Sequence, residues 1–597
     1  MSKEQIPCGC WPSPLPAELV AGKSVRLSQP TVLPDGRVLW TESRPDEQGR
    51  SVIVEWHPDH GCRDLLPAPY SAQSRANGYG GGVFAAIGDA VCFVNKEDQQ
   101  IHIIDADGIR QLTRLPGTRF GDLTPDALHD RLLVVAERDR ERQEPATVLA
   151  SVSLADGTLS VLDDRHDFHS TPALSNDGRQ LAWISWNHPD MPWDHTRLWL
   201  ADVNDDGSLG RRRCLLGDKE ESILQPGWCG NELLCVSDRS NWWNLYRVSD
   251  TEQVECVHAQ DAEFAQPHWV FGMRNWAALD GARLACSWTA DGDWHAGILE
   301  LESGQLEAID LPVTHIDQLT AVQGSIVIQG GNSTQGDGIY LWRDGELQTL
   351  KAPASLELPA GSLSRPRAVS FDSEGDTVHA FYYPPSNSHC EAPAGERPPL
   401  MIKAHGGPTG ATSSKLDLKI QYWTSRGFAV LDVNYRGSTG YGRAYRQALY
   451  GGWGKVDVAD IINGAAWCAS EGLADPGRLL LSGSSAGGFT LLNALVTSDE
   501  FAAAASYYGV AEPVSAMRDT EKFESRYGDK LIAPMPSGEA TWQARSPLAN
   551  AERIDRPVIF FQGLDDRIVL PQQSRQMAAA LRDQGIPHAL VEFEGEG

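Results

Sequence analysis

The chain has 597 residues, more than one hydrophobic core usually serves, so we expect at least two domains. Its net charge of -29 at pH 7 opposes nucleic acid or an anionic membrane as a partner. No stretch approaches the ~18 apolar residues of a membrane-spanning helix, and the first residues lack the apolar run of a signal peptide. The 11 cysteines are scattered, which favours a cytoplasmic protein with reduced thiols.

Residues 25–360 repeat one theme, in which a tight turn joins two β-rich stretches. Several of these turns are Asp-Gly pairs, a strong hairpin signal between apolar runs, at positions 35–36, 177–178, 280–281 and 344–345. At the ~40–50 residues expected of a four-stranded blade, the ~330 residues of this region correspond to about seven blades. We therefore predict a seven-bladed β-propeller. Two β-sandwiches are the alternative, and the even spacing disfavours them.

From residue 361 to residue 597, apolar strands alternate with helices. The strand-like runs include LMIKA, FAVLDVNY, RLLLSG and PVIFFQG, and helical patterns separate several of them. This alternation predicts a mostly parallel sheet covered by helices, and the turn described next makes it an α/β-hydrolase domain. Residues 1–24 form a separate segment, and one hypothesis is that it packs on this domain.

The sequence LLLSGSSAGGFTLL, residues 479–492, predicts a strand, a tight turn and a helix. Its Gly-x-Ser-x-Gly pattern is typical of a nucleophile elbow, where side chains two positions before and after the serine would collide. Of Ser482, Ser484 and Ser485, only Ser485 has glycine at both positions, so we predict Ser485 as the nucleophile. The alternative is a small-residue turn that serves packing alone.

Two further turns supply candidate partners for the serine. His405-Gly406-Gly407-Pro408 follows the strand LMIKA, and we expect the Gly407 N–H to bind an oxyanion together with the N–H of Ala486. Asp565 and Asp566 follow the strand PVIFF, where the acid that orients a catalytic histidine is expected. At this point either aspartate could serve, and a solvated loop is the alternative role for both.

Four motifs occur in a fixed order along the chain: His405 to Pro408, Asn434 to Gly442, Gly483 to Gly488, and Gly563-x-x-Asp566-x-x-Val569. Together they resemble the prolyl oligopeptidase family of serine peptidases. The nearer resemblance is to its acylaminoacyl-peptidase and dipeptidyl-aminopeptidase-like branch, including puromycin-hydrolase-like aminopeptidases. That family places a β-propeller before its hydrolase domain, so the resemblance covers essentially the whole chain. It implies Asp566 as the triad acid and puts Gly407 and Ala486 at the oxyanion positions.

The sequence departs from the family at two positions. Ile568 stands where prolyl oligopeptidases proper carry a substrate-anchoring arginine, which argues against a preference for internal proline. Gly78 stands where relatives often have an acidic residue before the propeller Tyr-Gly-Gly, so recognition of a substrate amino terminus needs another residue. We name Asp194 and Glu137 as substitutes. Asp194 ends the aromatic and polar loop 186–194, for which a binding role and simple packing are equally supported.

The expected catalytic histidine is not found in the sequence. It should follow the final strand, residues 588–593, and in the family it directly follows a Gly-Glu-Gly stretch such as residues 595–597. His588 begins that strand, about 20 Å from its other end, and His405 belongs to the oxyanion turn. The resemblance therefore implies that the natural protein continues with a histidine directly after Gly597.

The sequence as a whole predicts a serine peptidase that hydrolyses short peptides or aminoacyl amides near the amino terminus. We expect no metal and no cofactor, a short peptide or aminoacyl amide as the substrate, and no nucleic-acid or membrane partner; a homo-oligomer stays open. Two alternatives stay open as well. One is a catalytically inactive scaffold that binds peptides, and the other is an esterase with little peptidase activity.

Overall fold

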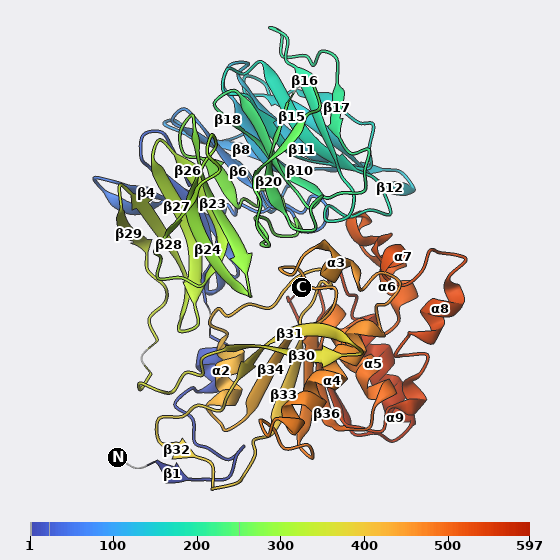
Figure 1. The fold of residues 1–597 in the computed structure, drawn as a ribbon. Helices are drawn as coiled ribbons and strands as arrows, with labels where there is room; N and C mark the ends of the chain where they lie inside the picture. Colours follow the sequence, from blue (N-terminus) through green and yellow to red (C-terminus); the bar gives the residue numbers. More distant parts are fainter. Residues whose placement is uncertain (1–2, 23, 250, 357, 597) are drawn as a thin grey trace. The chain divides into compact units, whose positions relative to one another are not determined.

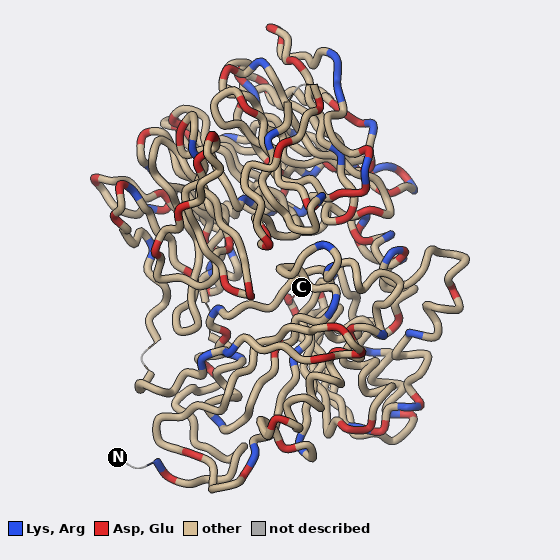
Figure 2. The backbone as a smooth tube through the Cα atoms, viewed as in Figure 1, with Lys and Arg blue, Asp and Glu red and all other residues tan. Residues whose placement is uncertain are grey.

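The computed structural model describes residues 3–22, 24–249, 251–356 and 358–596. The chain divides into two compact units (Figure 1). The propeller unit consists of Lys23–Asn332 with Asp337–Ala354, and the hydrolase unit is built mainly from the residues up to Gly22 and from Ser355 onward. None of the helices in the described ranges is both long and apolar enough to cross a membrane. Acidic and basic residues are interspersed over both units (Figure 2).

Within its described residues, the propeller unit contains seven four-stranded antiparallel sheets in chain order. The first four blades are β2 (Arg26–Val32), β3 (Val38–Arg44), β4 (Arg50–His57) and β5 (Gly61–Asp64); β6 (Phe84–Ile87), β7 (Ala90–Val94), β8 (Ile101–Asp105) and β9 (Gly108–Gln111); β10 (Thr118–Asp126), β11 (Arg131–Arg140), β12 (Gln143–Ser153) and β13 (Leu159–Asp163); β14 (Phe168–Leu174), β15 (Gln180–Trp186), β16 (Arg197–Asp202) and β17 (Arg213–Leu216). A 3-10 turn, η1 (Pro45–Glu47), lies between β3 and β4.

The remaining three blades are β18 (Ile223–Cys229), β19 (Glu232–Ser237), β20 (Asn244–Val248) and β21 (Val254–His258); β22 (Trp276–Ala278), β23 (Arg283–Ala290), β24 (Asp293–Glu300) and β25 (Leu306–Ile309); β26 (His315–Val322), β27 (Ser325–Asn332), β28 (Gln335–Arg343) and β29 (Glu346–Lys351). Apolar side chains of neighbouring blades pack together, so the core is divided among the blade interfaces. The predicted seven-bladed propeller is confirmed.

Side-chain amides connect several neighbouring blades. Gln29, at a bulge in β2, donates to Phe84 O at 2.8 Å and accepts from Val83 N at 2.8 Å. Gln225, at a bulge in β18, makes the same kind of paired bonds to the first strand of the next blade. Gln329 of the last blade donates to Leu27 O at 2.7 Å in the first. These bonds satisfy buried backbone groups that no β ladder reaches.

The hydrolase unit is built on one eight-stranded sheet with the order β30-β31-β34-β33-β35-β36-β37-β38. Its strands are β30 (Arg367–Ser373), β31 (Asp376–Tyr383), β33 (Leu400–Ala404), β34 (Ala429–Asn434), β35 (Leu479–Ser484), β36 (Phe501–Tyr507), β37 (Val558–Gly563) and β38 (His588–Phe593). The strands from β34 to β38 in this order run parallel, and β31 pairs antiparallel with β34. Every residue of β34 is buried, as expected for a central strand covered on both faces.

Helices lie against both faces of the sheet, with α2 (Leu418–Thr424) on one side and α4 (Val456–Ser470) and α5 (Ala486–Thr497) on the other (Figure 1). The other helices are α3 (Arg443–Gln447), α6 (Pro513–Asp519), α7 (Tyr527–Leu531), α8 (Glu539–Ala544) and α9 (Gln572–Asp583), with 3-10 turns η2 (Lys522–Glu524) and η3 (Ala551–Arg553). This arrangement confirms the predicted α/β-hydrolase fold.

The N-terminal segment belongs to the hydrolase unit. Its strand β1 (Glu4–Gln5) pairs with β32 (Cys390–Glu391), and a short helix, α1 (Ala17–Val20), follows. Trp11 is buried with the thiols of Cys8 and Cys390 in a small apolar cluster. Beyond these strands, Gly9 N donates to Arg426 O at 3.1 Å, which ties the segment to the end of α2.

Candidate active site

Ser485 occupies the sharp turn between β35 and α5. Its backbone has φ 52° and ψ -120°, a conformation that L-residues with side chains rarely adopt. The backbone is held there by hydrogen bonds on both sides, because Ser485 N donates to Tyr507 O at 3.0 Å and Ser485 O accepts from Phe489 N at 3.2 Å. The residue itself is only partly buried. The strand, turn and helix therefore present one serine at the C-terminal edge of the sheet, as a nucleophile elbow does.

The glycines around Ser485 are required by close backbone contacts. A Cβ atom on Gly483 would lie 2.5 Å from Gly487 O, and one on Gly487 would lie 2.1 Å from Ala404 O. A Cβ atom on Gly488 would lie 2.4 Å from the Cα of Gly509. Real Cβ atoms do not approach backbone atoms this closely, so the elbow fits against β33 and β36 only with glycine at these positions.

The glycine-rich turn after β33 lies directly beside the serine. Ala404, at the end of β33, is paired with Gly483 of β35. A Cβ atom on Gly406 would be 3.5 Å from the Cβ of Ser485. Gly407 has φ +122°, which is open to glycine alone at little cost, and Ala486 is the buried first residue of α5. Ala486 thus follows Ser485 directly in the chain, and the turn that contains Gly407 lies beside the serine at Gly406.

His405 fixes this turn and is itself fully occupied. Its Nδ1 lies 2.8 Å from Gly406 O, its Nε2 lies 2.7 Å from Ser438 Oγ, and its ring stacks on Tyr435 with centroids 4.3 Å apart. Burial lowers the pKa of His405, so its neutral form is favoured. Farther along, Thr409 N donates to Tyr527 Oη at 3.1 Å. His405 therefore has a structural role in the turn.

Lys403 is a half-buried cation at the end of the strand before this turn, and the sequence analysis missed it. Its Nζ lies 3.0 Å from Asp417 Oδ2 and 3.1 Å from Asp432 Oδ2, and these two carboxylates raise its pKa against the effect of burial. Asp432 Oδ2 also accepts from Thr412 Oγ1 at 2.6 Å, at the far end of the glycine-rich turn. The sequence offers one signal for this network, a lysine inside an otherwise apolar strand.

The acid candidates lie in the loop after β37, two strands away from β35. Asp566 Oδ1 accepts from Ile568 N and from Val569 N, both at 2.9 Å, which leaves Oδ2 with no hydrogen bond to any described residue. Asp565 is exposed, and its backbone N donates to Glu596 O at 2.8 Å. A carboxylate that orients a histidine must itself be fixed and keep one oxygen open. Asp566 meets both requirements better than Asp565.

No histidine of the described residues hydrogen-bonds to Ser485 or to Asp566. His588 is exposed at the start of β38, where it pairs with Val558, whereas the acid loop begins at Gly563 on the opposite end of β37. The end of the described chain does approach the acid loop, through Phe593 O and Glu596 O, which accept from Leu564 N and Asp565 N. Nucleophile and acid are thus at one edge of the sheet, and the base is not among the residues described.

Glu137 and Asp194, the candidate substrate anchors, are both buried in the propeller unit. Glu137 Oε2 accepts from Asn77 N and from Arg119 Nε, each at 3.0 Å, so it lies beside the turn that contains Gly78. Asp194 Oδ2 accepts from Met191 N at 2.9 Å within the loop 186–194. Trp186, at the start of that loop, stacks on Phe168 with ring centroids 5.1 Å apart, and both roles considered for the loop stay open.

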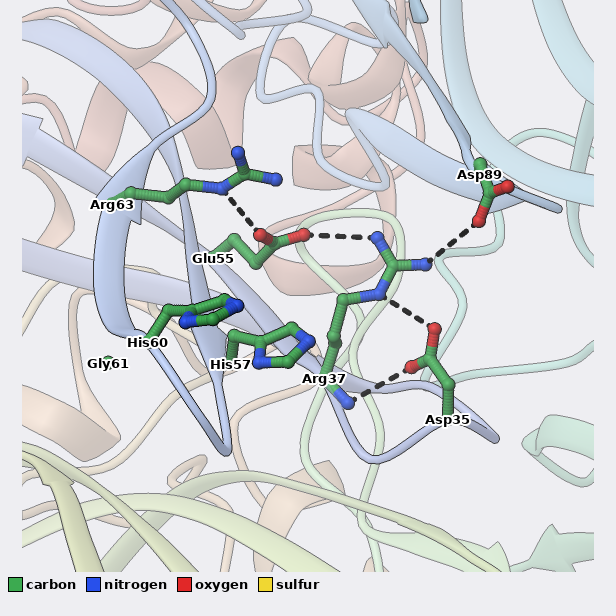
Figure 3. Close-up of a pocket in the computed structure, with 8 residues that line it drawn as sticks. All are labelled: Asp35, Arg37, Glu55, His57, His60, Gly61, Arg63 and Asp89. Carbon is green, nitrogen blue, oxygen red and sulfur yellow. Dashed lines mark hydrogen bonds and ion pairs between the residues drawn. The ribbon is translucent and has the colours of Figure 1, made fainter. Parts of the chain in front are cut away.

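A polar cavity of about 520 Å³ at the edge of the first blade is unrelated to this chemistry (Figure 3). Glu55 is buried at its centre and accepts from Arg37 Nη1 at 3.0 Å and Arg63 Nε at 2.6 Å. The remaining lining residues are Asp35, His57, His60, Gly61 and Asp89. Its charged groups thus partly neutralise one another, and none of these residues is a serine or cysteine nucleophile.

No group of three or more His, Cys, Asp or Glu side chains in the described ranges is arranged to hold a metal ion.

Comparison with known proteins agrees with this geometry. Residues 414–597 match the prolyl oligopeptidase family. A puromycin-hydrolyzing peptidase of Mycobacterium tuberculosis has 38% sequence identity over 100% of this chain and 94% of its own, with a TM-score of 0.94. A crystal structure of puromycin hydrolase has 35% identity over the same shares, with a TM-score of 0.95. The chain therefore belongs to the prolyl oligopeptidase family.

Matches to curated relatives cover shorter regions. Dipeptidyl aminopeptidase BIII of Pseudoxanthomonas mexicana is 30% identical over 205 residues, which is 33% of this chain and 30% of that protein. The acylamino-acid-releasing enzyme of Arabidopsis thaliana is 28% identical over 249 residues, 40% of this chain and 32% of that protein. The chain thus spans about a third of the length of the curated relatives that it matches. The predicted family is confirmed, together with its acylaminoacyl and dipeptidyl peptidase relatives.

Proposed function

We propose that the protein is a serine peptidase that hydrolyses short peptides or aminoacyl amides near the amino terminus. The single observation that carries this proposal is Ser485, which stands on a strained elbow, directly before Ala486 and beside the glycine-rich turn at Gly406. Such an arrangement serves acyl transfer, because a tetrahedral intermediate needs two N–H donors next to its nucleophile. Membership of the prolyl oligopeptidase family supports the same reaction.

In the proposed mechanism, Ser485 Oγ attacks the carbonyl carbon while a histidine takes its proton. The N–H groups of Gly407 and Ala486 bind the oxyanion, and Asp566 Oδ2 accepts from the histidine and holds its tautomer. The histidine is proposed to follow Gly597 directly. Support for this position comes from Glu596, whose carbonyl already accepts from Asp565 N next to the proposed acid. The same histidine then gives its proton to the leaving amine.

We propose small substrates because the similar proteins are named for the hydrolysis of a small molecule, puromycin. The similar structures include a puromycin-hydrolyzing peptidase and a puromycin hydrolase variant solved in complex with PGG. For the substrate amino terminus we keep Asp194 and Glu137 as proposed anchors. Both side chains already accept hydrogen bonds within the propeller unit, Glu137 from Arg119 Nε and Asp194 from Met191 N, so both are targets for mutation. We also propose a cytoplasmic location, and we leave open whether the protein forms a homo-oligomer.

A peptide-binding scaffold is the second candidate, and one observation favours it. Among the described residues neither Ser485 nor Asp566 has a histidine partner, and a triad without its base keeps only the residual ~10³–10⁴-fold catalysis of the oxyanion and binding contacts. The two candidates therefore differ in whether a histidine reaches Asp566.

The experiment compares the 597-residue chain with the same chain extended by a histidine after Gly597. We expect the extended chain to react with a fluorophosphonate probe and to hydrolyse a dipeptide anilide. Ser485→Ala should abolish both, a loss of about 10⁶-fold in turnover, whereas the matched variant Ser484→Ala should keep them. Failure of the extended chain to react would favour the scaffold, and hydrolysis of an ester but not the anilide would identify an esterase. An intact mass of the natural protein equal to 597 residues would contradict the proposed histidine position.

A further inference from the structure

The connection between the fifth and sixth blades is long and touches blades far from its own. It joins β21 to β22 through residues 259–275. Near its start, Phe264 N donates to Trp243 O in the fifth blade at 2.7 Å, and Glu263 pairs with Thr289 in the sixth. Gln266 Nε2 then donates to Asp317 O at 2.9 Å, on the innermost strand of the seventh blade. The connection has by then left the gap between its own two blades.

The middle of this connection reaches the one between the first and second blades. Phe271 N donates to Gly80 O at 2.8 Å, and Phe271 forms a parallel bridge with Gly81. The ring of Trp269 contacts Tyr79, with centroids 5.5 Å apart, and Trp193 of the fourth blade, with centroids 4.5 Å apart. We call residues 266–274 the hub strap.

Phe271 anchors the strap in an apolar site of the second and third blades. Its ring packs with Ala76 and Val135. A Cβ atom on Gly121 would lie 2.8 Å from this ring, and one on Gly81 would lie 2.3 Å from Phe271 O. The strap is therefore in direct contact with the opposite wall, and glycine is needed there to let it approach.

The strap also has an electrostatic link across the hub. Arg274, at its end, attracts the carboxylate of Asp122 on the innermost strand of the third blade. Burial lowers the pKa of Arg274 and raises that of Asp122, and the attraction between the two groups opposes both shifts. Asp122 itself accepts from Thr171 N at 2.5 Å, so it is fixed within the propeller.

The order of the blades shows that these contacts cross the propeller axis. Seven blades surround a central channel at intervals of about 50°, so the first-to-second and fifth-to-sixth junctions lie roughly 150° apart around it. Both connections lead from an outermost strand to the next innermost strand. They therefore lie at the end of the channel where β2 begins and β29 ends.

We propose that the hub strap closes this end of the propeller channel, that Phe271 is its anchor, and that no peptide chain passes along the propeller axis. Where this bears on substrate choice it rests on the proposed peptidase function. The strap then becomes a specificity-determining element, because an extended polypeptide cannot be fed through the propeller.

The first test needs no catalytic activity and uses the 597-residue chain. Native protein is treated with chymotrypsin, and cleavage after Trp269 is followed by mass spectrometry of the fragments. We expect the wild type to resist cleavage there and Phe271→Ala to be cut at least about tenfold faster, because local opening governs such cleavage. Phe93→Ala removes from the second blade a buried ring that makes no contact with the strap and should leave Trp269 resistant, as should the conservative Phe271→Leu.

Rapid cleavage of the wild type at Trp269, equal to that of Phe271→Ala, would overturn the closed strap.

The second test uses the histidine-extended chain and compares kcat/KM for a long and a short peptide with the same residues around the scissile bond. We expect Phe271→Ala to raise the long-to-short ratio about tenfold, because opening becomes frequent, and Phe93→Ala to leave it unchanged. If Phe271→Ala is cleaved faster in the first test but its long-to-short ratio of kcat/KM is unchanged, the proposed role of the strap in specificity is overturned. Absence of turnover in every variant would contradict the proposed function, while the cleavage result would still decide the strap.

Discussion

Ser485 and Asp566 lie at the same edge of one sheet, with only β36 between their strands, yet different contacts hold them. Ser485 is held by the sheet itself, since the elbow touches the backbone of β33 and every residue of α5 except Thr497 is buried. Asp566 is held by two N–H groups of its own loop. The neighbouring β38 is largely exposed and lies at the open edge of the sheet.

This difference indicates how the two parts of the site respond to mutation. We call the elbow around Ser485 with α5 the nucleophile half, and the loop of Asp566 with the chain end that contacts it the acid half. The nucleophile half cannot shift without disturbing the packing of three strands and a helix, so its geometry is tied to the stability of the unit. The acid half can rearrange within one loop at little cost to the core. Mutations in the acid half should therefore affect activity more than stability, and mutations at the elbow glycines should affect both.

The largest expected effect is on turnover in the acid half. In the histidine-extended chain, Asp566→Asn should lower kcat by about 10⁴-fold, because an amide no longer selects the histidine tautomer that accepts the serine proton. Stability should change little, because the side-chain carbonyl of the substituted residue can still accept from Ile568 N and Val569 N. Steady-state kinetics with a dipeptide anilide, together with a thermal melt, measure the two effects.

Asp565→Asn is the matched control, since Asp565 is exposed and contributes only its backbone N–H to the chain end. It should keep turnover within about threefold of the wild type, as surface substitutions usually do. A severe loss in Asp565→Asn with a mild one in Asp566→Asn would move the acid by one position and would contradict the role given to the two backbone N–H groups.

A pair of glycine substitutions sharpens the same comparison in terms of stability. Gly487→Ala places a Cβ atom 2.1 Å from Ala404 O, so we expect a loss of about 3 kcal/mol or more, or failure to fold. Gly595→Ala, in the acid half, keeps φ +74° but meets no atom within 4 Å, so only the left-handed backbone costs about 1 kcal/mol. Urea unfolding of the two variants measures the difference. Equal losses would show that the two halves are equally constrained.

Local features of this protein could be predicted from the sequence, and distant contacts could not. The elbow is predictable because the close contacts that require Gly483 and Gly487 arise from a turn of only five residues, which forms a recognisable sequence pattern. The blades are predictable because Asp-Gly turns occur repeatedly between apolar β-rich stretches of residues 25–360. By contrast, Gln29 bridges to a strand more than fifty residues away, and Phe271 meets Gly81 across the propeller, so no local pattern marks either contact.

The polar contacts inside the hydrolase unit could not be predicted from the sequence either. Lys403 gave a faint signal as a charge within an apolar strand, but its partners Asp417 and Asp432 come from different elements. The choice between Asp565 and Asp566 needed the family register, because residue type is the same at both positions. The structure distinguishes them by the hydrogen bonds that Asp566 Oδ1 accepts.

Asp457 in α4 provides a test of the nucleophile half by pH. Its Oδ2 accepts from Thr490 Oγ1 at 2.5 Å in the nucleophile helix α5, and its Oδ1 accepts from Gly454 N at 2.6 Å. Burial raises the pKa of Asp457 from 3.8 to about 6, and the neighbouring carboxylate of Asp460 adds to the rise. The folded state therefore binds the proton more tightly than the unfolded state does.

The consequence is a loss of stability as pH rises, because the folded unit binds more protons than the unfolded chain between about pH 4 and pH 6. Below that range the carboxyl is protonated in both states, and above it the cost of the buried charge is complete, up to about 3 kcal/mol for a shift of this size. Asp457→Asn removes the charge and keeps an acceptor for Gly454 N, while Thr490 can still donate to Ala486 O, 3.2 Å away.

We therefore expect Asp457→Asn to be more stable than the wild type at pH 8 and to lose this advantage as the pH is lowered to 4. Urea unfolding of both proteins at several pH values measures the difference, which cancels every other group that titrates in the same range. Asp475→Asn, on a partly exposed carboxylate paired with Arg478, is the matched control and should show the opposite trend, because the pKa of Asp475 is lowered in the folded state. A difference between Asp457→Asn and the wild type that does not vary with pH would mean that Asp457 is ionised in the folded unit over the whole range.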